Sequence, residues 1–229
     1  MGKVIAIDGP SGAGKSTVSR LIAEKLGFQF LDTGALYRAV ALHLRRKGLD
    51  ADNTDEEIRD ALKGVSVFFK DGRVFLKDNS RLKTQNSELF SGEDVSEEIR
   101  TTEAGHYASV FSAKKAVRDF LLQIQRDAAI ENDIVAEGRD MTTVVFPNAW
   151  KKFYLDASEE GRAKRRYQQL KDKGIDIAME AALKDVRERD IRDSSRDIAP
   201  LKRADDAIYI DTTDLSLDEV LERVLQSLK

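Results

Sequence analysis

A glycine-rich stretch near the N-terminus carries the residues best suited to phosphate chemistry. Residues 3 to 17, KVIAIDGPSGAGKST, run from a β-branched apolar segment ending at Asp8 into the spacing G-x-x-x-x-G-K-S/T. Glycines let successive backbone N–H groups converge on an anion, and the helix expected over residues 17 to 26 directs its positive dipole end to the same place. The spacing predicts a nucleoside-triphosphate site formed by Gly9, Pro10, Ser11, Gly12, Ala13, Gly14, Lys15, Ser16 and Thr17.

Lys15 and Ser16 supply the two functional side chains of this pattern. In such sites the lysine reaches the β- and γ-phosphates, and the hydroxyl of the next residue binds Mg²⁺. A glycine-rich turn with a lysine can also be an ordinary loop between a strand and a helix. The apolar strand before it and the amphipathic helix after it favour a nucleotide site. A nucleoside triphosphate and Mg²⁺ at Ser16 are therefore the expected ligands.

Arginines form the second chemical pattern. Two highly charged helical stretches carry a density of guanidinium groups that suits phosphoryl transfer, namely Arg162, Arg165, Arg166, Arg187, Arg189, Arg192 and Arg196. Arg189, Asp193 and Arg196 follow the spacing i, i+4, i+7 and are expected on one helix face. The alternative is a solvated stripe of ion pairs, each contributing only about 0.3 kcal/mol. The pattern by itself leaves both interpretations open.

Short apolar runs predict the strands that position these residues. Besides the segment ending at Asp8, they cover residues 28–31, 134–140, 151–157 and 207–211. Strand-turn-helix alternation predicts an α/β fold, with five parallel strands and helices on both faces. Ligands bind beyond the carboxyl ends of such strands, so the polar residues there are expected on one rim, namely Asp8, Gly9, Asp32, Thr33, Glu137 to Asp140, Asp156, Asp211 and Thr212.

Residues 65–76 interrupt this alternation. The runs VSVFF and RVFL flank Lys70-Asp71-Gly72, which predicts an antiparallel hairpin with a tight turn. The polar stretch from 77 to 94 is expected to be a loop with one edge strand near 88–90. Helices are expected over residues 35–48, 54–63, 113–131 and 217–228. The third of them carries an apolar stripe of Val117, Phe120, Leu121 and Ile124.

Composition excludes several classes of protein. The 229 residues contain no cysteine, which rules out disulfides, cysteine-ligated zinc and a thiol nucleophile. The net charge of −3 argues against a general nucleic-acid binder, and no apolar run is long enough to span a membrane. His43 and His106 are too isolated to suggest a metal site and are expected at the surface or a pocket edge. We expect a cytoplasmic monomer without nucleic-acid or membrane partners.

The glycine-rich motif does not by itself choose between a nucleotide-dependent switch, an ATPase and a small-molecule kinase. The sequence has no Asn-Lys-x-Asp segment of the kind that reads guanine, and it shows no second long domain of the kind a motor or transporter ATPase needs. A kinase for a small acceptor is therefore favoured. An acceptor such as UMP or a guanine nucleotide, or a switch that turns over slowly, stays open as an alternative.

Stretches spread over the whole chain resemble the bacterial cytidylate kinases, which belong to the nucleoside-monophosphate kinases. They are IDGPSGAGKST (7–17), LDTGALYRA (31–39), GEDVSEEIRT (92–101), EGRDMTTVVFP (137–147), LDASEEGRAKRR (155–166), ERDIRDSSRDIAPL (188–201) and IDTTDLSLDEV (210–220). The resemblance implies one kinase domain over residues 1–229 with three parts. A P-loop core of five parallel strands spans about 1–38, 113–157 and 200–229, a monophosphate-binding insertion about 39–112, and an arginine-rich helical lid about 158–199.

The resemblance also implies a reaction, in which the γ-phosphate of ATP passes in line to CMP and dCMP without a covalent intermediate. Mg²⁺ would assist, and the products CDP and dCDP belong to pyrimidine nucleotide metabolism. Two departures from the family pattern stand out. Thr142 occupies a position where the family usually has glycine, and the polar stretch from about 77 to 90 is longer than expected.

Individual roles follow from the resemblance, residue by residue. The catalytic groups would be Lys15, Arg139, Arg189 and Arg196. The lid side facing ATP would include Arg162, Arg165 and Arg166. The sugar and phosphate of CMP would meet Arg38, Arg139, Arg189, Asp193 and Arg196, with Thr33 where the family has a small hydroxyl residue. The cytosine edge would be read by Ser109, Arg118 and Asp140.

Overall fold

The computed structural model describes residues 2–70, 72–79 and 92–228. These residues form two compact units. The first, which we call the sheet unit, contains Met1–Asp32 and Ala128–Lys229, and the second, the hairpin unit, contains Thr33–Asp127. The sheet unit is therefore built from two segments that are far apart in the sequence, whereas the hairpin unit is one continuous segment.

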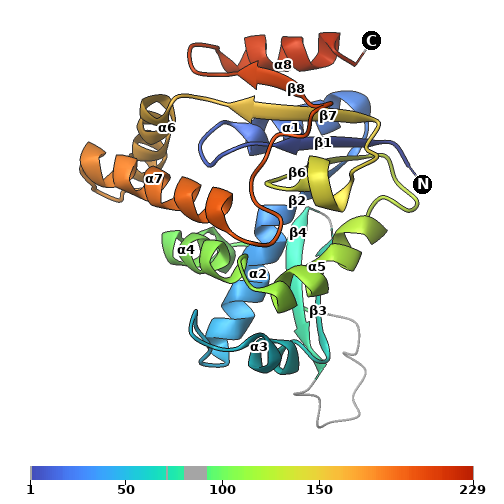
Figure 1. Ribbon diagram of the computed structural model, residues 1–229, viewed down its shortest axis with the longest axis vertical. Helices are drawn as coiled ribbons and strands as arrows, with labels where there is room; N and C mark the ends of the chain where they lie inside the picture. The colour runs from blue at the N-terminus through green and yellow to red at the C-terminus, as the bar shows by residue number, and fades with distance from the viewer. Residues whose placement is uncertain (1, 71, 80–91, 229) are drawn as a thin grey trace. The chain divides into compact units, whose positions relative to one another are not determined.

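Five parallel strands form the centre of the sheet unit (Figure 1). Their spatial order is β2 (Gln29–Asp32), β6 (Ile134–Gly138), β1 (Val4–Asp8), β7 (Lys151–Asp156) and β8 (Ile208–Asp211). Every residue of β1 and β6 is buried, as is typical of central parallel strands covered on both faces. The predicted strands and their parallel arrangement are confirmed, so all five carboxyl ends meet at one rim.

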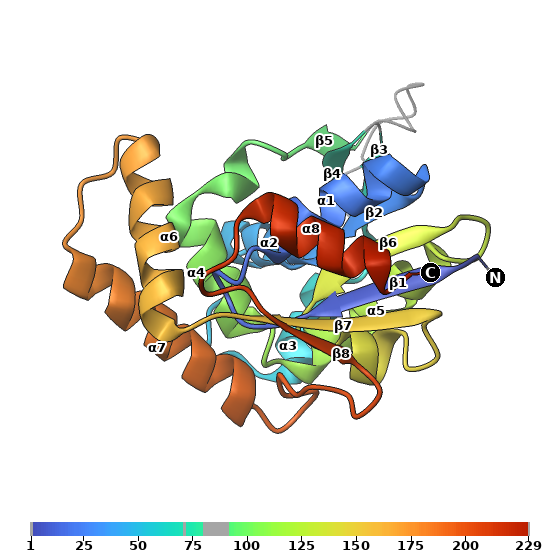
Figure 2. The same ribbon diagram turned by 90° about the horizontal axis from the view of Figure 1, so that it is seen from above.

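Two helices, α1 (Lys15–Leu26) and α8 (Leu217–Gln226), lie side by side on the sheet (Figure 2). Their apolar faces join strand residues in one core, which includes Ile5, Ile7, Val18, Ile22, Val135, Phe153, Leu155, Val220, Leu221 and Val224. The start of α8 is fixed by a capping box in which Ser216 and Glu219 satisfy each other's backbone N–H groups. This packing holds the N-terminus of α1 at the rim.

The two predicted charged helices are α6 (Glu159–Asp172) and α7 (Met179–Ser195), which pack against each other (Figure 1). Ser158 caps α6 as expected, since its side chain accepts a hydrogen bond from the Gly161 N–H. Arg196 differs from the expectation. It lies beyond the helix in an extended conformation with ψ 140°, so Arg189, Asp193 and Arg196 do not share one helix face.

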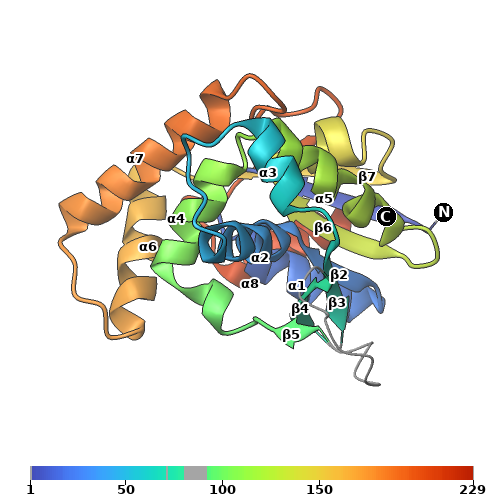
Figure 3. The same cartoon turned by 90° about the horizontal axis from the view of Figure 1, so that it is seen from below.

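The hairpin unit combines helices with a small antiparallel sheet (Figure 3). The strands β3 (Val65–Lys70) and β4 (Arg73–Asp78) form the predicted hairpin, and β5 (Glu93–Asp94) pairs with β4. The expected edge strand near 88–90 lies outside the described residues. The helices are α2 (Thr33–Arg46), α3 (Asp55–Ala61), α4 (Thr102–Phe111) and α5 (Lys115–Asp127), with a short 3₁₀ turn at Glu98–Arg100. Nowhere in the described part of the chain is a helix both long and apolar enough to cross a membrane.

The hairpin unit also corrects one expectation. His43 is buried, at 3% exposure, and its Nε2 lies 2.9 Å from the Ala61 carbonyl oxygen at the end of α3. The prediction of a position at the surface or at a pocket edge missed this burial, because the sequence does not show that the end of α3 lies against His43. His106 is exposed, as expected.

Gly9 leaves no room for a side chain in the sheet unit. Its φ is +147°, and a Cβ added there would lie 1.9 Å from the Leu155 carbonyl oxygen. The contact arises because β1 and β7 are paired up to Asp8 and Tyr154, immediately before the chain turns into the loop. No side chain fits at this position without separating the two central strands.

We therefore expect Gly9→Ala to reduce the free energy of unfolding by about 3 kcal/mol or more. The matched control is Gly27→Ala, which has φ +67° but no atom within 4 Å of the added Cβ. That change should cost only about 1 kcal/mol. Urea denaturation of both variants checks the difference, and equal losses would contradict the steric argument.

Candidate active site

The loop of residues 9–14 joins β1 to α1 at the rim of the sheet. Gly14 has φ +87° and stands at the N-terminal cap position of α1, which begins directly at Lys15. The first amide groups of a helix have no acceptor within it, so they remain available to a ligand at this end. Together with the helix dipole they form a cradle for an anion such as a phosphate.

Lys15 is buried beneath this loop, with 5% of its surface exposed. Its Nζ donates a hydrogen bond to the Pro10 carbonyl oxygen at 2.7 Å. The pKa of Lys15 is lowered to about 7, mainly by burial and then by the positive charge of Arg139, whereas the carboxylate of Glu137 acts in the opposite direction. An anion bound at the loop would favour the protonated lysine.

Ser16 and Glu137 bring two oxygen ligands together at the same end of the sheet. The Ser16 hydroxyl donates a hydrogen bond to Glu137 Oε1. Glu137 is buried near the end of β6, opposite Ile7 on β1. A hydroxyl and a carboxylate are the kind of ligands that Mg²⁺ prefers. No group of three or more potential metal-ligating side chains occurs within residues 2–70, 72–79 and 92–228.

Glu137 was not predicted as a site residue. The available signal was its place at the carboxyl end of a predicted strand. This signal is weak, because every strand end has such a position, whether or not its residue has a chemical role. The structure adds that its carboxylate contacts the hydroxyl of the motif residue Ser16. Only the sheet order, which places β6 beside β1, reveals this contact.

Arg139 and Asp193 form a largely buried ion pair between the end of β6 and the last turns of α7. Arg139 Nε donates to Asp193 Oδ2 at 2.7 Å, and Asp193 is only 4% exposed. Burial raises the pKa of Asp193, but the charges of Arg139 and Arg189 outweigh it and hold this pKa below its ordinary value. Asp193 is thus not part of a solvated stripe.

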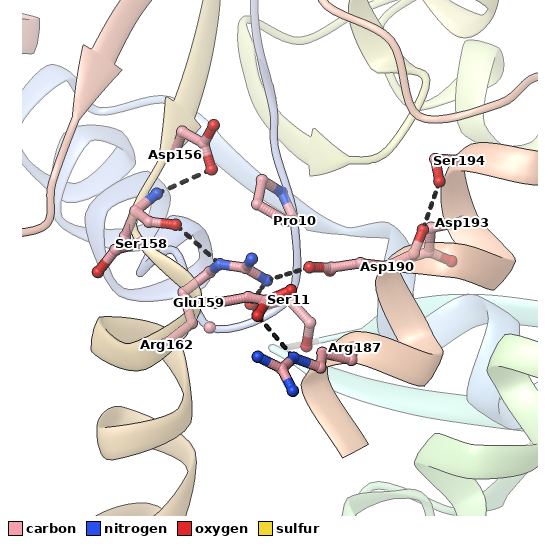
Figure 4. A network of polar contacts seen from close by, with 12 residues as sticks. Pro10, Ser11, Asp156, Ser158, Glu159, Arg162, Arg187, Asp190, Asp193 and Ser194 are labelled. Carbon is pink, nitrogen blue, oxygen red and sulfur yellow. Dashed lines mark hydrogen bonds and ion pairs between the residues drawn. The ribbon is translucent and has the colours of Figure 1, made fainter. Parts of the chain in front are cut away.

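Arg162 connects α6, the loop and α7 (Figure 4). Its Nε donates to the Ala157 carbonyl oxygen at 2.9 Å, and its Nη1 donates to the Ser11 carbonyl oxygen at 3.3 Å. The same Nη1 pairs with Asp190 Oδ2 at 2.6 Å. The side chain is almost fully buried. This guanidinium therefore fixes the loop backbone from the side of the charged helices.

Arg165 makes a second set of contacts to the loop. Its Nη1 donates to the Gly12 carbonyl oxygen at 3.3 Å and to Thr212 Oγ1 at 3.0 Å, and its Nη2 donates to the Thr212 carbonyl oxygen. Arg166 is placed differently, since its Nε pairs with Asp185 on α7 at 3.2 Å. Of the three predicted lid arginines, Arg162 and Arg165 thus contact the loop, whereas Arg166 joins the two helices.

Arg189 and Arg196 also belong to this charged region. Both lower the pKa of Asp193 through their positive charges, and the charge of Arg189 acts on Lys15 as well. Arg196 Nε donates to the Ala199 carbonyl oxygen at 2.6 Å, within the turn that follows α7. Five predicted residues of the sheet unit therefore lie close enough for their charges to interact, namely Lys15, Arg139, Arg189, Asp193 and Arg196.

The hairpin unit carries four of the other predicted residues, whereas Asp140 lies buried in the sheet unit, directly after Arg139. Thr33 is buried at the start of α2, and Arg38 is partly exposed on the same helix, without a hydrogen bond or ion pair to any residue that the structure describes. Arg118 and Ser109 converge on Ser112. The Arg118 Nη1 donates to the Ser112 carbonyl oxygen at 3.0 Å, and the Ser112 hydroxyl donates to the Ser109 carbonyl oxygen at 2.8 Å.

Comparisons with known proteins give one family over nearly the whole chain. Residues 5–229 match the family model for cytidylate kinase. A cytidylate kinase of Thermodesulfovibrio yellowstonii is 56% identical, over 99% of this chain and 97% of its own length. That of Thermosipho melanesiensis is 47% identical, over 98% and 96%. The crystal structure of an uncharacterized protein from Eubacterium ventriosum aligns with TM-score 0.51, 12% identity and coverage of 99% and 98%, which shows a shared fold alone.

The lowered pKa of Lys15 predicts a pH-dependent contribution to stability. Its ordinary value is 10.5, so between pH 7 and 10.5 the unfolded chain binds more protons than the folded one at this group. The group therefore makes the free energy of unfolding rise with pH across that window, by at most about 1.4 kcal/mol per pH unit.

We expect wild type to gain more stability than Lys15→Met between pH 7 and 9, measured by urea denaturation at each pH. Contributions of other titrating groups cancel in this difference. Lys25→Met, which removes an exposed lysine of the same helix, controls for the loss of a lysine as such. Parallel stability curves for wild type and Lys15→Met would contradict the burial argument.

Proposed function

The chain belongs to the cytidylate kinase family, and on that premise we propose that it transfers the γ-phosphate of ATP to CMP, giving ADP and CDP. The observation that carries the proposal is the buried Lys15 beneath an anion cradle, with Arg139 and Arg189 acting on it electrostatically. Phosphoryl transfer spreads negative charge over the moving group, and positioned cations are what such a transition state requires.

On the donor side, the backbone N–H groups of residues 9–14 and the Lys15 ammonium would hold the β- and γ-phosphates. Arg162 and Arg165 bind carbonyl oxygens of this loop, and that contact supports a place for them beside the bound ATP. Arg166 pairs with Asp185, so its contribution to ATP binding requires this pair to open. Lys15 exchanges its bond to the Pro10 carbonyl for the stronger interaction with phosphate.

Mg²⁺ fits the oxygen groups at Ser16 and Glu137. When bound, the ion neutralises charge on the β- and γ-phosphates of the nucleotide. Ser16 would supply the hydroxyl ligand, and the carboxylate of Glu137, which contacts this hydroxyl, would supply an oxygen next to it. The lack of a larger acidic cluster around them in the described residues agrees with an ion that keeps several waters and phosphate oxygens as ligands.

On the acceptor side, Arg139 would hold the 5′-phosphate of CMP. Its Nε donates to Asp193 and its Nη1 donates to the Gly138 carbonyl oxygen at 3.3 Å, which fixes the plane of the guanidinium and leaves its remaining N–H groups for the phosphate. Arg189 and Arg196 would add charge from the end of α7. The roles of Thr33, Arg38, Ser109 and Arg118 in acceptor binding stay predictions, as do the acceptor dCMP, the division into core, insertion and lid, the monomeric state, the cytoplasmic location and the absence of nucleic-acid and membrane partners.

Asp140 would read the base. Cytosine presents an amino group at its 4-position, which a carboxylate can accept, whereas uracil presents a carbonyl oxygen there. Asp140 is 3% exposed, so an acceptor facing its carboxylate would be desolvated without a hydrogen bond. Such a mismatch costs on the order of 2 kcal/mol or more, which corresponds to roughly thirtyfold discrimination or better.

The proposal is tested by measuring ADP release with ATP and each nucleoside monophosphate in turn. We expect CMP to give the highest kcat/KM, and Lys15→Met to reduce turnover about a hundredfold or more, because it removes a charge needed in the transition state. Faster turnover with UMP or GMP would assign another acceptor. ADP release without any acceptor dependence would favour a slow nucleotide-dependent switch instead.

For base selection, we expect Asp140→Ala to lower kcat/KM for CMP and to narrow the ratio between CMP and UMP. Asp140→Asn should narrow this ratio at least as much, because an amide can donate a hydrogen bond to the uracil carbonyl. Steady-state kinetics with both acceptors checks it. If activity on both bases falls in parallel, Asp140 only supports its neighbour Arg139 and does not read the base.

A further inference from the structure

Asp8 is a fully buried carboxylate at the carboxyl end of the central strand, and it accepts three hydrogen bonds. Its Oδ1 accepts from the Met141 N–H at 2.9 Å. Its Oδ2 accepts from the Thr142 N–H at 2.7 Å and from the Thr142 hydroxyl at 2.6 Å. All three donors come from one short segment. The side chain of Asp8 thus binds the start of the helical turn Met141–Val145, whose first amides have no acceptor within the turn.

The same residue also holds the other side of the segment that carries Arg139 and Asp140. The backbone of Asp8 pairs with Gly138 in the parallel ladder between β1 and β6. Asp8 therefore fixes Gly138 with its backbone and Met141 with its side chain. Only Arg139 and Asp140 lie between these two points of attachment. Their backbone has little freedom as long as the carboxylate keeps its donors.

We propose that Asp8 and Thr142 are positioning residues for acceptor binding, which act by fixing the backbone of Arg139 and Asp140 from both sides. The inference rests on the proposed function, in which these two residues bind the acceptor. Thr142 matters because its hydroxyl is the only side-chain group among the three donors. A side chain of the same shape without the hydroxyl leaves a fully buried carboxylate one donor short.

The ionisation of Asp8 depends on its burial, its hydrogen bonds and the charged groups around it. Asp140 and Arg139 act on it from the segment after β6, and Tyr154 lies opposite it on β7. Burial raises the pKa of Asp8 to about 6, and the hydrogen bonds from Thr142 and Met141 oppose this rise. Loss of the Thr142 hydroxyl therefore raises the pKa of Asp8 further. Protonation of Asp8 then weakens its hydrogen bonds to residues 141 and 142 at a higher pH than in wild type.

The test compares Thr142→Val, Thr142→Ser and Thr143→Val in the full chain, using the monophosphate that wild type phosphorylates fastest. Thr143 is the matched control, because its hydroxyl is buried and has no hydrogen-bond partner in the part of the chain that the structure describes. We expect Thr142→Val to lower kcat/KM for the acceptor about tenfold or more, while the KM for ATP changes less than about threefold. Thr142→Ser and Thr143→Val should stay within about threefold of wild type.

The pH profile separates positioning from a general loss of stability. In Thr142→Val the acid limb of kcat/KM for the acceptor should move to higher pH, whereas Thr143→Val should leave it in place. Wild-type kinetics in Thr142→Val, or equal losses for ATP and acceptor with an unmoved acid limb, would overturn the proposal. If Thr142→Val does not fold, Thr142→Ala is compared with Thr142→Ser in the same way. Because the acceptor is chosen by wild-type activity, a wrong assignment of CMP does not affect this test.

Discussion

The carboxyl end of β1 is the constraint on which the candidate site depends. Asp8 and Gly9 lie where the central strand leaves the sheet between β6 and β7. Gly9 passes so close to the Leu155 carbonyl that no side chain is possible, and this contact sets the direction of the phosphate-binding loop. Asp8 binds the segment after β6 with its carboxylate. Two adjacent residues thus position the donor side and the acceptor side of the proposed reaction.

Charge balance is the second feature of the sheet unit. Buried cations are costly unless they have partners, and three cations of this unit are held by protein oxygens. Lys15 bonds to the Pro10 carbonyl, Arg139 to Asp193, and Arg162 to Asp190 and the Ser11 carbonyl. These partners are neutral carbonyls or single carboxylates. A polyphosphate carries more negative charge than any of them. The arrangement keeps the cations in position before the substrates arrive and lets the substrates compete for them.

The sequence predicted the features that depend on local pattern. The apolar runs gave all five strands, and the motif around Lys15 gave the loop and the start of α1 within two residues. Features that depend on tertiary contacts were missed. The helix α4, which buries Ala104, Ala108 and Phe111, was not predicted, and neither was the turn Met141–Val145, whose first amides donate to Asp8. The contact of Glu137 with Ser16, and the departure of Arg196 from α7, follow from packing and not from spacing.

The order of segments in the sheet unit has a consequence for synthesis on the ribosome. β1 and β2 emerge first, but every strand that pairs with them lies after residue 133. The Asp8 carboxylate has none of its donors until residue 141 has been made. The hairpin unit is one continuous segment, Thr33–Asp127, and has been synthesised in full before that point. The nascent chain must therefore keep the apolar β1 unpaired while more than half of the protein is translated, and an unpaired apolar strand is prone to aggregation during that time.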